Sequence, residues 1–269
     1  MDLSPTIVIE TLRALAAEAG RRIMTFYAGE VAVTHKDDQS PLTAADQASH
    51  AYLVAGLRER FPSLPVLSEE GRSIPFEERR AWRRFFLVDP LDGTKEFLRR
   101  NGEFTVNIAL VEEGAPWLGV VHLPAAGTTY WGGAGLGAWR RVGDAAAEPI
   151  RCRQAPQGGP WRVVASRSHP SPELEHLLKR IKVEELVPAG SSLKFCRVAE
   201  GEADLYPRFG PTMEWDTAAG QAVLEGAGGV VIDERGCPLR YNKECLRNPR
   251  FLAAGFRWEG PWAAFPATD

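Results

Sequence analysis

The strongest local signal in this chain is Asp89-Pro90-Leu91-Asp92-Gly93-Thr94, which directly follows an apolar run, Phe85 to Val88, with the length of a buried strand. Pro90 fixes one backbone dihedral and Gly93 permits an unusual one, so the turn can direct both aspartates and an intervening carbonyl toward one point. A hard divalent cation such as Mg²⁺ prefers a cage of such oxygens. The same residue types are common in solvated turns, so this segment alone leaves both interpretations open.

Two more acidic groups stand at the ends of predicted elements. Glu69 and Glu70 follow a short apolar run, Val66 to Ser68, and Asp216 begins a predicted helix. Taken singly, Glu70 is explained as a solvated side chain and Asp216 as a helix N-cap. Three such groups in one chain are harder to explain separately. Together they favour a divalent-cation site at which carboxylates from distant parts of the sequence meet.

The bulk composition indicates a folded globular protein with no strong field for a nucleic-acid polymer. The chain has 269 residues, 44% of them hydrophobic and 25% charged, and its net charge is -3. Its cysteines lack the spacing of zinc ligands, so we expect buried thiols at Cys152, Cys196, Cys237 and Cys245. No segment has the pattern of a signal peptide or a membrane span. We expect a cytoplasmic protein, with loose attachment to the inner membrane left open.

The first half of the chain has the pattern of an α+β arrangement. Pro5 begins a predicted helix that stops before Gly29, and Thr43 with Asp46 resembles a capping pair for a second helix that ends near Arg60. A short strand is expected around Val31 and Val33. Three successive strands are then predicted at residues 105–112, 117–122 and 128–131.

The second half changes to alternating strands and helices after Arg162. Helices are predicted at about residues 172–181, 192–200 and 216–225. This order favours an α/β unit. We therefore expect an α+β part over residues 1–150, which carries most of the metal ligands, and an α/β part over residues 151–269, with the joint at residues 143–159.

The acidic segments together resemble the signature of a known family. The order and spacing of Asp46, Leu67-Ser68-Glu69-Glu70, the segment Val88 to Thr94, and Trp215-Asp216-Thr217-Ala218-Ala219-Gly220 are similar to those of the inositol monophosphatase superfamily. Its members are lithium-sensitive, magnesium-dependent phosphatases. The resemblance implies a layered αβαβα sugar-phosphatase fold and a hydrolase.

Other segments resemble one branch of that family, the bacterial 3'(2'),5'-bisphosphate nucleotidases of sulfur assimilation. These are Lys95-Glu96-Phe97, residues 101–110, Ser166-Arg167-Ser168-His169, residues 190–196 and residues 205–212. The branch implies a small nucleotide substrate and hydrolysis of the 3'-phosphate of adenosine 3',5'-bisphosphate to give AMP. Two alternatives stay open: an inositol monophosphatase, and a non-catalytic regulatory protein that binds divalent cations.

The resemblance also implies roles for individual residues. Glu69, Asp89 and the Leu91 carbonyl are expected to hold a first Mg²⁺, and Asp89, Asp92 and Asp216 a second, with Asp89 bridging both. A weaker third ion at Glu69 is an open alternative. Thr94 is expected to orient the attacking water, while Asp46, sharing the role with Glu69, helps to accept its proton.

The remaining expectations concern the substrate. The resemblance and the chemistry of the residues imply that the substrate contacts Glu69, Leu91, Asp92, Gly93, Thr94, His169, Ser192, Lys194, Tyr206 and Asp216. Backbone N–H groups near Ser192 and the ammonium of Lys194 are expected to receive a second phosphate.

Three weaker features have ordinary structural explanations. Gly133 and Gly135 are interpreted as part of a glycine-rich hairpin, and the basic residues from Arg79 to Arg84 as a solvated face. No meaning is assigned to Glu214. The oligomeric state is left as monomer or homodimer.

Overall fold

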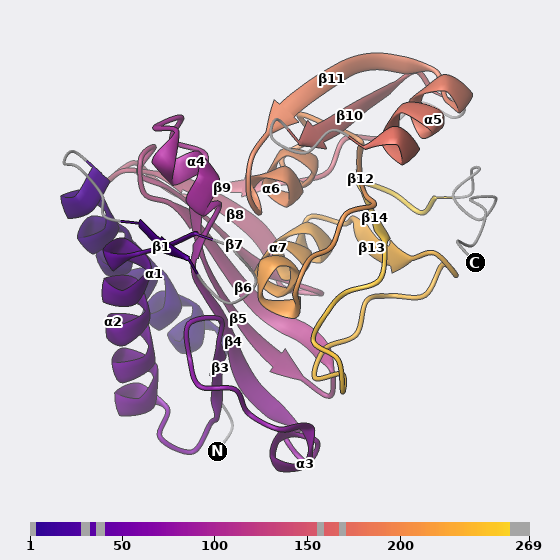
Figure 1. The fold of residues 1–269 in the computed structure, drawn as a ribbon. Helices are drawn as coiled ribbons and strands as arrows, with labels where there is room; N and C mark the ends of the chain where they lie inside the picture. Colours follow the sequence, from indigo (N-terminus) through magenta and orange to yellow (C-terminus); the bar gives the residue numbers. More distant parts are fainter. Residues whose placement is uncertain (1–3, 28–32, 36–40, 155–158, 167–170, 259–269) are drawn as a thin grey trace.

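The protein folds into five alternating layers of helices and sheets, seen in a computed structural model that describes residues 4–27, 33–35, 41–154, 159–166 and 171–258 (Figure 1). Helices α1 and α2 cover one face of a seven-stranded sheet, and α6 and α7 lie between that sheet and a five-stranded one. Helix α5 packs on the outer face of the smaller sheet. The expected αβαβα arrangement is confirmed. These helices are α1 (Pro5–Tyr27), α2 (Ala44–Arg60), α5 (Pro172–Arg180), α6 (Leu193–Ala199) and α7 (Glu214–Gly226).

The larger sheet runs in sequence order, β3-β4-β5-β6-β7-β8-β9. Strands β3 and β4 are parallel, and every later pair is antiparallel, as in a meander. The three predicted meander strands are confirmed. Strands β8 and β9 were not predicted, because β8 carries arginines that break the apolar alternation. The strands are β3 (Val66–Ser68), β4 (Arg84–Asp92), β5 (Thr105–Glu112), β6 (Ala115–Leu123), β7 (Thr128–Gly133), β8 (Gly137–Val142) and β9 (Glu148–Ile150).

The smaller sheet has the order β11-β10-β12-β14-β13. Strand β10 is parallel to both β11 and β12, as a strand-helix alternation predicts, and β14 is antiparallel to β12 and β13. Its strands are β10 (Trp161–Ser166), β11 (Val183–Ala189), β12 (Leu205–Arg208), β13 (Val230–Asp233) and β14 (Phe251–Ala254). Four short elements complete the secondary structure of the described residues: the paired strands β1 (Val33–His35) and β2 (Pro41–Thr43), and the helices α3 (Phe76–Arg79) and α4 (Thr94–Leu98).

The two sheets share one hydrophobic core. Phe85 and Leu87 of β4 belong to the same buried cluster as Phe195 of α6, Tyr206 of β12 and Val231 of β13. Helix α7 also packs across the larger sheet. The division of the chain near residue 150 stays a prediction.

Helix α7 lies close to the larger sheet because both contact surfaces carry small side chains. A Cβ added at Gly119 of β6 would lie 2.4 Å from the carbonyl oxygen of Ala219 and 2.8 Å from the Ala222 Cβ. Ala219 and Ala222, the residues of α7 that face Gly119, are both buried. The absence of a side chain at Gly119 therefore sets the height of α7 above the sheet.

Two expectations about individual side chains are wrong. Arg79 is not on a solvated face: it is 2% exposed and donates hydrogen bonds to backbone carbonyls of residues far along the chain. Cys237 and Cys245 are exposed rather than buried, whereas Cys196 is buried. Burial of these residues depends on packing of distant segments, which local composition does not encode.

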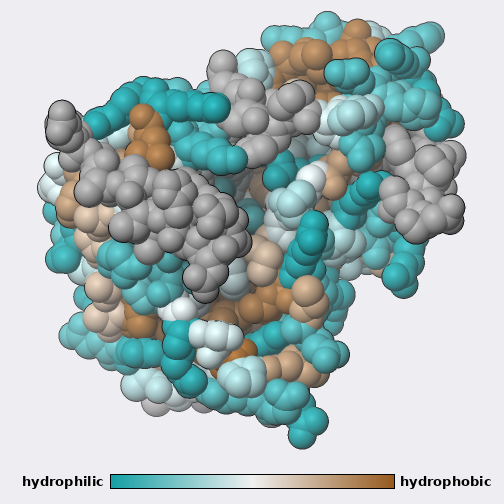
Figure 2. Space-filling view, viewed as in Figure 1, coloured by the Kyte–Doolittle hydropathy of each residue, from teal (hydrophilic) through white to brown (hydrophobic). Residues whose placement is uncertain are grey.

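The surface agrees with the polar composition of the chain. The face shown in Figure 2 is mostly hydrophilic, and its apolar residues form separate patches. Among the described residues, no helix has both the length and the apolar character needed to span a bilayer.

The contact between α7 and β6 makes a testable prediction. Replacement of Gly119 by alanine should lower the free energy of unfolding by about 2 kcal/mol, because the new methyl group meets backbone and not a flexible side chain. Urea unfolding measures the change. The control is Gly210→Ala, whose new Cβ has its nearest neighbour at 3.8 Å. Equal stability of the two variants would contradict the proposed close packing.

Candidate active site

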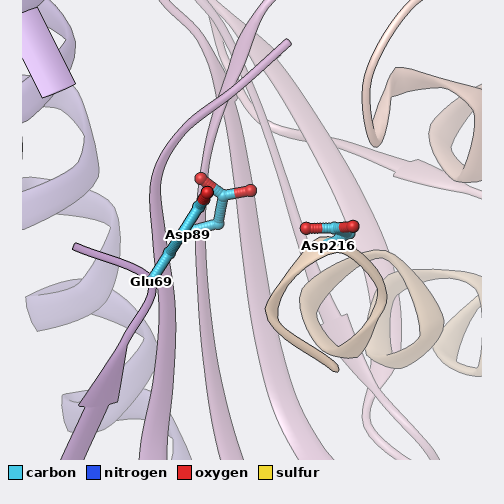
Figure 3. A group of neighbouring side chains, drawn as sticks. All are labelled: Glu69, Asp89 and Asp216. Carbon is cyan, nitrogen blue, oxygen red and sulfur yellow. The ribbon is translucent and has the colours of Figure 1, made fainter. Parts of the chain in front are cut away.

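Three carboxylates from separate elements converge at the end of the larger sheet. Glu69 follows β3, Asp89 lies in β4, and Asp216 lies in the first turn of α7. One oxygen of each lies within 4.8 Å of the others. Figure 3 shows Glu69 and Asp89 side by side, with Asp216 opposite them. The expectation that the three acidic segments meet is confirmed.

An irregularity in β4 presents its two aspartates. The pairing with β5 shifts between Asp89 and Asp92, so the strand bulges there. The Leu91 N–H donates to Asp89 Oδ1 at 3.0 Å, and the Ser49 hydroxyl donates to the Pro90 carbonyl at 2.7 Å. Gly93 has φ +87°, a conformation that a side chain would strain. The dihedral role expected of Gly93 is confirmed.

Burial and like charge both raise the pKa of the carboxylates at this site. Asp89 is 1% exposed, and its pKa lies well above the ordinary value for an aspartate. Burial is the largest cause of this rise, and the negative charges of Glu69, Asp92 and Asp216 add to it. The pKa of Asp216 is also raised, by burial first and then by Asp92. Such a group of oxygen donors needs positive charge, and its composition fits a hard divalent cation.

Asp92 joins the two halves of the site. The Ser192 N–H at the start of α6 donates to Asp92 Oδ2 at 2.5 Å. Burial raises the pKa of Asp92 to about 6, against the opposing effects of the Lys194 ammonium and the Ser192 hydrogen bond. Asp92 does not belong to the group of three convergent carboxylates formed by Glu69, Asp89 and Asp216.

Asp46 and Thr94 lie beside the acidic group. The Thr43 N–H and hydroxyl both donate to Asp46 Oδ2, which forms the predicted capping box at the start of α2. The other oxygen, Oδ1, accepts from the Thr94 hydroxyl at 3.4 Å. Asp46 is 2% exposed, and burial raises its pKa despite the hydrogen bonds from Thr43.

A cavity of about 210 Å³ opens above these residues. Asp92 comes from β4 of the larger sheet and Glu69 from the residue after β3. The C-terminal half adds the acidic Asp216 of α7 and the cations Lys194 of α6 and Arg208 of β12. The cavity is lined by Glu69, Asp92, Gly93, Thr94, Lys95, Glu96, Ser191, Ser192, Lys194, Phe195, Tyr206, Arg208, Thr212, Asp216 and Thr217. It therefore offers both a site for cations and a site for anions.

Lys194 is held in the wall of the cavity. It is 5% exposed, and its ammonium lies 5.4 Å from the centre of the Tyr206 ring. Burial lowers the pKa of Lys194 to about 8, although Asp92 acts to raise it. A buried cation of this kind gains by meeting an anion.

Arg208 is a cavity residue that sequence reasoning did not select. Its Nη2 donates to the Pro211 carbonyl at 3.1 Å, but its Nε is buried and has no hydrogen-bond partner among the described residues. Within the segment from Leu205 to Thr212, the family resemblance implies a substrate contact at Tyr206 alone. The available signal was an arginine two residues after that tyrosine.

The other expected contacts have mixed outcomes. Ser192 lines the cavity, but its N–H donates to Asp92 and its hydroxyl to Asn107 at 2.7 Å, so these donors already have partners. The Leu91 side chain is buried in the core, and the role of its carbonyl stays a prediction. His169 lies outside the described residues.

Comparisons with known proteins find relatives over most of the chain. A model of the inositol monophosphatase family matches residues 4–263. A Salmonella typhimurium protein named 3'(2'),5'-bisphosphate nucleotidase CysQ is 48% identical over 247 residues, covering 91% of this chain and 98% of the relative. A protein of the same name from Escherichia coli K12 is 50% identical over 240 residues, covering 88% and 95%. The crystal structure of CysQ from Bacteroides thetaiotaomicron has a TM-score of 0.76 and 43% identity, covering 89% and 94%.

Charge crowding at Asp89 leads to a prediction about stability. Magnesium at a hundredfold excess over its Kd should stabilise the protein by about 2.7 kcal/mol, or roughly 5–10 °C in Tm. Asp89→Asn should remove most of this rise, and the metal-free variant should unfold at a Tm no lower than that of the wild type, because one buried like charge is gone.

Calorimetry with and without a chelator measures both quantities. Sodium chloride at equal ionic strength controls for screening of surface charges. An unchanged Mg²⁺ effect in the variant would show that the ion binds elsewhere.

Proposed function

The chain belongs to the inositol monophosphatase family, and we propose that it is a phosphomonoesterase that converts adenosine 3',5'-bisphosphate to AMP and phosphate. The names of the relatives at 48% and 50% identity support the reaction. The observation in this chain that carries the proposal is one cavity lined by both the carboxylates of Glu69 and Asp216 and the cations of Lys194 and Arg208.

The cation that fits this site is Mg²⁺, and we propose two ions. Glu69, Asp89 and the Leu91 carbonyl would hold one, and Asp89, Asp92 and Asp216 the other. When bound, such ions lower the pKa of a coordinated water and offset the charge of phosphate oxygens. The raised pKa values of Asp89 and Asp216 support this assignment, because carboxylates crowded by like charge gain most from a cation.

Thr94 and Asp46 are proposed to position the attacking water and accept its proton. The Thr94 hydroxyl donates to Asp46 Oδ1, which leaves the hydroxyl oxygen as an acceptor toward the cavity. Burial raises the pKa of Asp46 and makes its carboxylate a stronger base. Water would then attack the phosphorus in line with the departing 3'-oxygen.

The second phosphate and the nucleoside are proposed to lie on the C-terminal side of the cavity. Lys194 and Arg208 supply two positive charges, and Arg208 Nε is a buried donor that a phosphate oxygen would satisfy. The Tyr206 ring offers an apolar surface beside them. Inositol 1-phosphate has no second phosphate to pair with these cations.

The first functional prediction separates catalysis from cation binding. Thr94→Val keeps the shape of the side chain and removes the hydroxyl, so kcat should fall by about 100-fold or more while the Mg²⁺-induced rise in Tm is retained. Phosphate release and calorimetry on the same preparations test this. If kcat is unchanged, Thr94 does not act on the water. If the wild type releases no phosphate from any phosphomonoester, the alternative of a non-catalytic regulatory protein is favoured.

The second functional prediction concerns substrate choice. Values of kcat/KM should be much higher for adenosine 3',5'-bisphosphate than for inositol 1-phosphate, and Lys194→Ala should narrow the difference by about tenfold or more, since a buried charge-assisted contact is lost. Both substrates are assayed with both proteins at one Mg²⁺ concentration. A preference of the wild type for inositol 1-phosphate would favour the inositol monophosphatase alternative. If Lys194→Ala lowers kcat/KM equally for both substrates, Lys194 lies outside the second-phosphate site.

A further inference from the structure

Glu214, the first residue of α7, is fully buried and bound by three donors. Its side chain has 0% exposure. Oε2 accepts from the Asn242 N–H at 2.7 Å, and Oε1 accepts from the Lys243 N–H at 2.9 Å and from the Lys243 ammonium at 2.7 Å. A buried carboxylate without such partners would be costly. Here it ties the start of α7 to a segment almost thirty residues further along the chain.

Arg79 of α3 holds the same segment from the opposite side. Its Nη1 donates to the Lys243 carbonyl at 2.5 Å and to Asn242 Oδ1 at 3.0 Å, and its Nη2 donates to the Glu244 carbonyl at 2.7 Å. Asn242 returns a hydrogen bond from its Nδ2 to the Arg79 carbonyl at 2.7 Å. We call residues 242–244, with Arg79 and Glu214 on their two sides, the bracket.

The two residues that hold the bracket are each linked to one of the convergent carboxylates: Arg79 to the connection that follows Glu69, and Glu214 to the helix turn that carries Asp216. Arg79 Nε donates to the Ile74 carbonyl at 3.3 Å, in the connection that runs from Glu69 to α3. At the other end, Asp216 lies two residues after Glu214, and its Oδ2 accepts from the Met213 N–H at 2.8 Å. The bracket thus spans from the connection that carries Glu69 to the helix turn that carries Asp216.

We propose that the bracket sets the separation between Asp216 and the pair Glu69 and Asp89, so that Glu214 and Arg79 are positioning residues for divalent-cation binding. This inference rests on the proposed cation site. Neither residue lines the cavity, and each binds backbone groups of residues 242–244. A cation held by three carboxylates from three elements requires those elements to keep one spacing, which the bracket supplies.

Glutamate has a specific advantage over glutamine at position 214. All three neighbouring donors point at the carboxylate, and two of them are backbone N–H groups that cannot move away. In Glu214→Gln one acceptor oxygen becomes an NH₂ group that faces a donor, and the Lys243 ammonium loses its ionic partner. We expect the turn with Asp216 to shift while the hydrophobic core under α7 remains.

The test measures cation affinity without substrate. Binding of Mn²⁺, which takes oxygen ligands as Mg²⁺ does, is followed by electron paramagnetic resonance at 20 °C on samples whose circular dichroism shows them to be folded. Glu214→Gln should weaken Mn²⁺ binding by about tenfold or more. Arg79→Lys, which keeps the charge but loses the two-nitrogen fork, should act in the same direction. In the double variant the fold-loss of Mn²⁺ affinity should be much smaller than the product of the fold-losses in the two single variants, because both residues act on one bracket.

The matched control is Glu225→Gln, the same substitution at the other end of α7, where the side chain accepts a hydrogen bond from Gln221 Nε2 at 2.8 Å. It should leave Mn²⁺ affinity unchanged, even if it lowers Tm. Wild-type affinity in both Glu214→Gln and Arg79→Lys, or an equal loss in Glu225→Gln, would overturn the proposal. If the wild type binds Mn²⁺ and Asp89→Asn does not, the proposed cation site stands whatever the bracket variants show. Failure of the wild type to bind Mn²⁺ would overturn both.

Discussion

The crowding of carboxylates around Asp89 is the constraint on which the rest of this structure depends. Glu69 after β3, Asp89 in β4 and Asp216 in α7 each bring one oxygen within 4.8 Å of the others, and burial and like charge raise the pKa of Asp89 and Asp216. The group opposes its own assembly unless positive charge joins it. The surrounding structure must therefore hold the three elements rigidly: by sheet pairing for β3 and β4, by close packing at Gly119, and by the bracket at Glu214.

Both halves of the chain contribute charged side chains to one cavity. The larger sheet carries Asp89 and Asp92, and the C-terminal half adds Lys194 and Arg208 as well as Asp216. Because the Ser192 N–H binds Asp92, the cationic side is fastened directly to the acidic side. A substrate with two phosphates would suit this division, since one phosphate would approach the proposed cations at the carboxylates and the other would approach Lys194 and Arg208. The cavity depends on both sheets being held against the α6 and α7 layer.

Much of the fold and of the acidic site was predictable because the signals are local. The Thr43 and Asp46 capping box, the turn at Gly93, and the apolar periods of α1 and of β5 to β7 each depend on residues within a few positions of one another. Strands β8, β9 and β14 escaped prediction because they are short or interrupted by charged residues and are stabilised by neighbours in the sheet. Arg208 escaped because a lone arginine does not indicate the cavity it enters.

The sequence by itself determined which carboxylates are present, their order along the chain and the turn chemistry that presents Asp89 and Asp92. It also determined family membership, since all the acidic segments occur in one order and spacing. Only the tertiary structure decided which polar groups are buried and what they bind. Glu214 and Arg79 look like ordinary surface residues in the sequence, yet both are at most 2% exposed and hold the same distant segment. The reason is physical: a hydrogen bond to a backbone group places no requirement on the identity of the side chain there, so it leaves no pattern in the sequence.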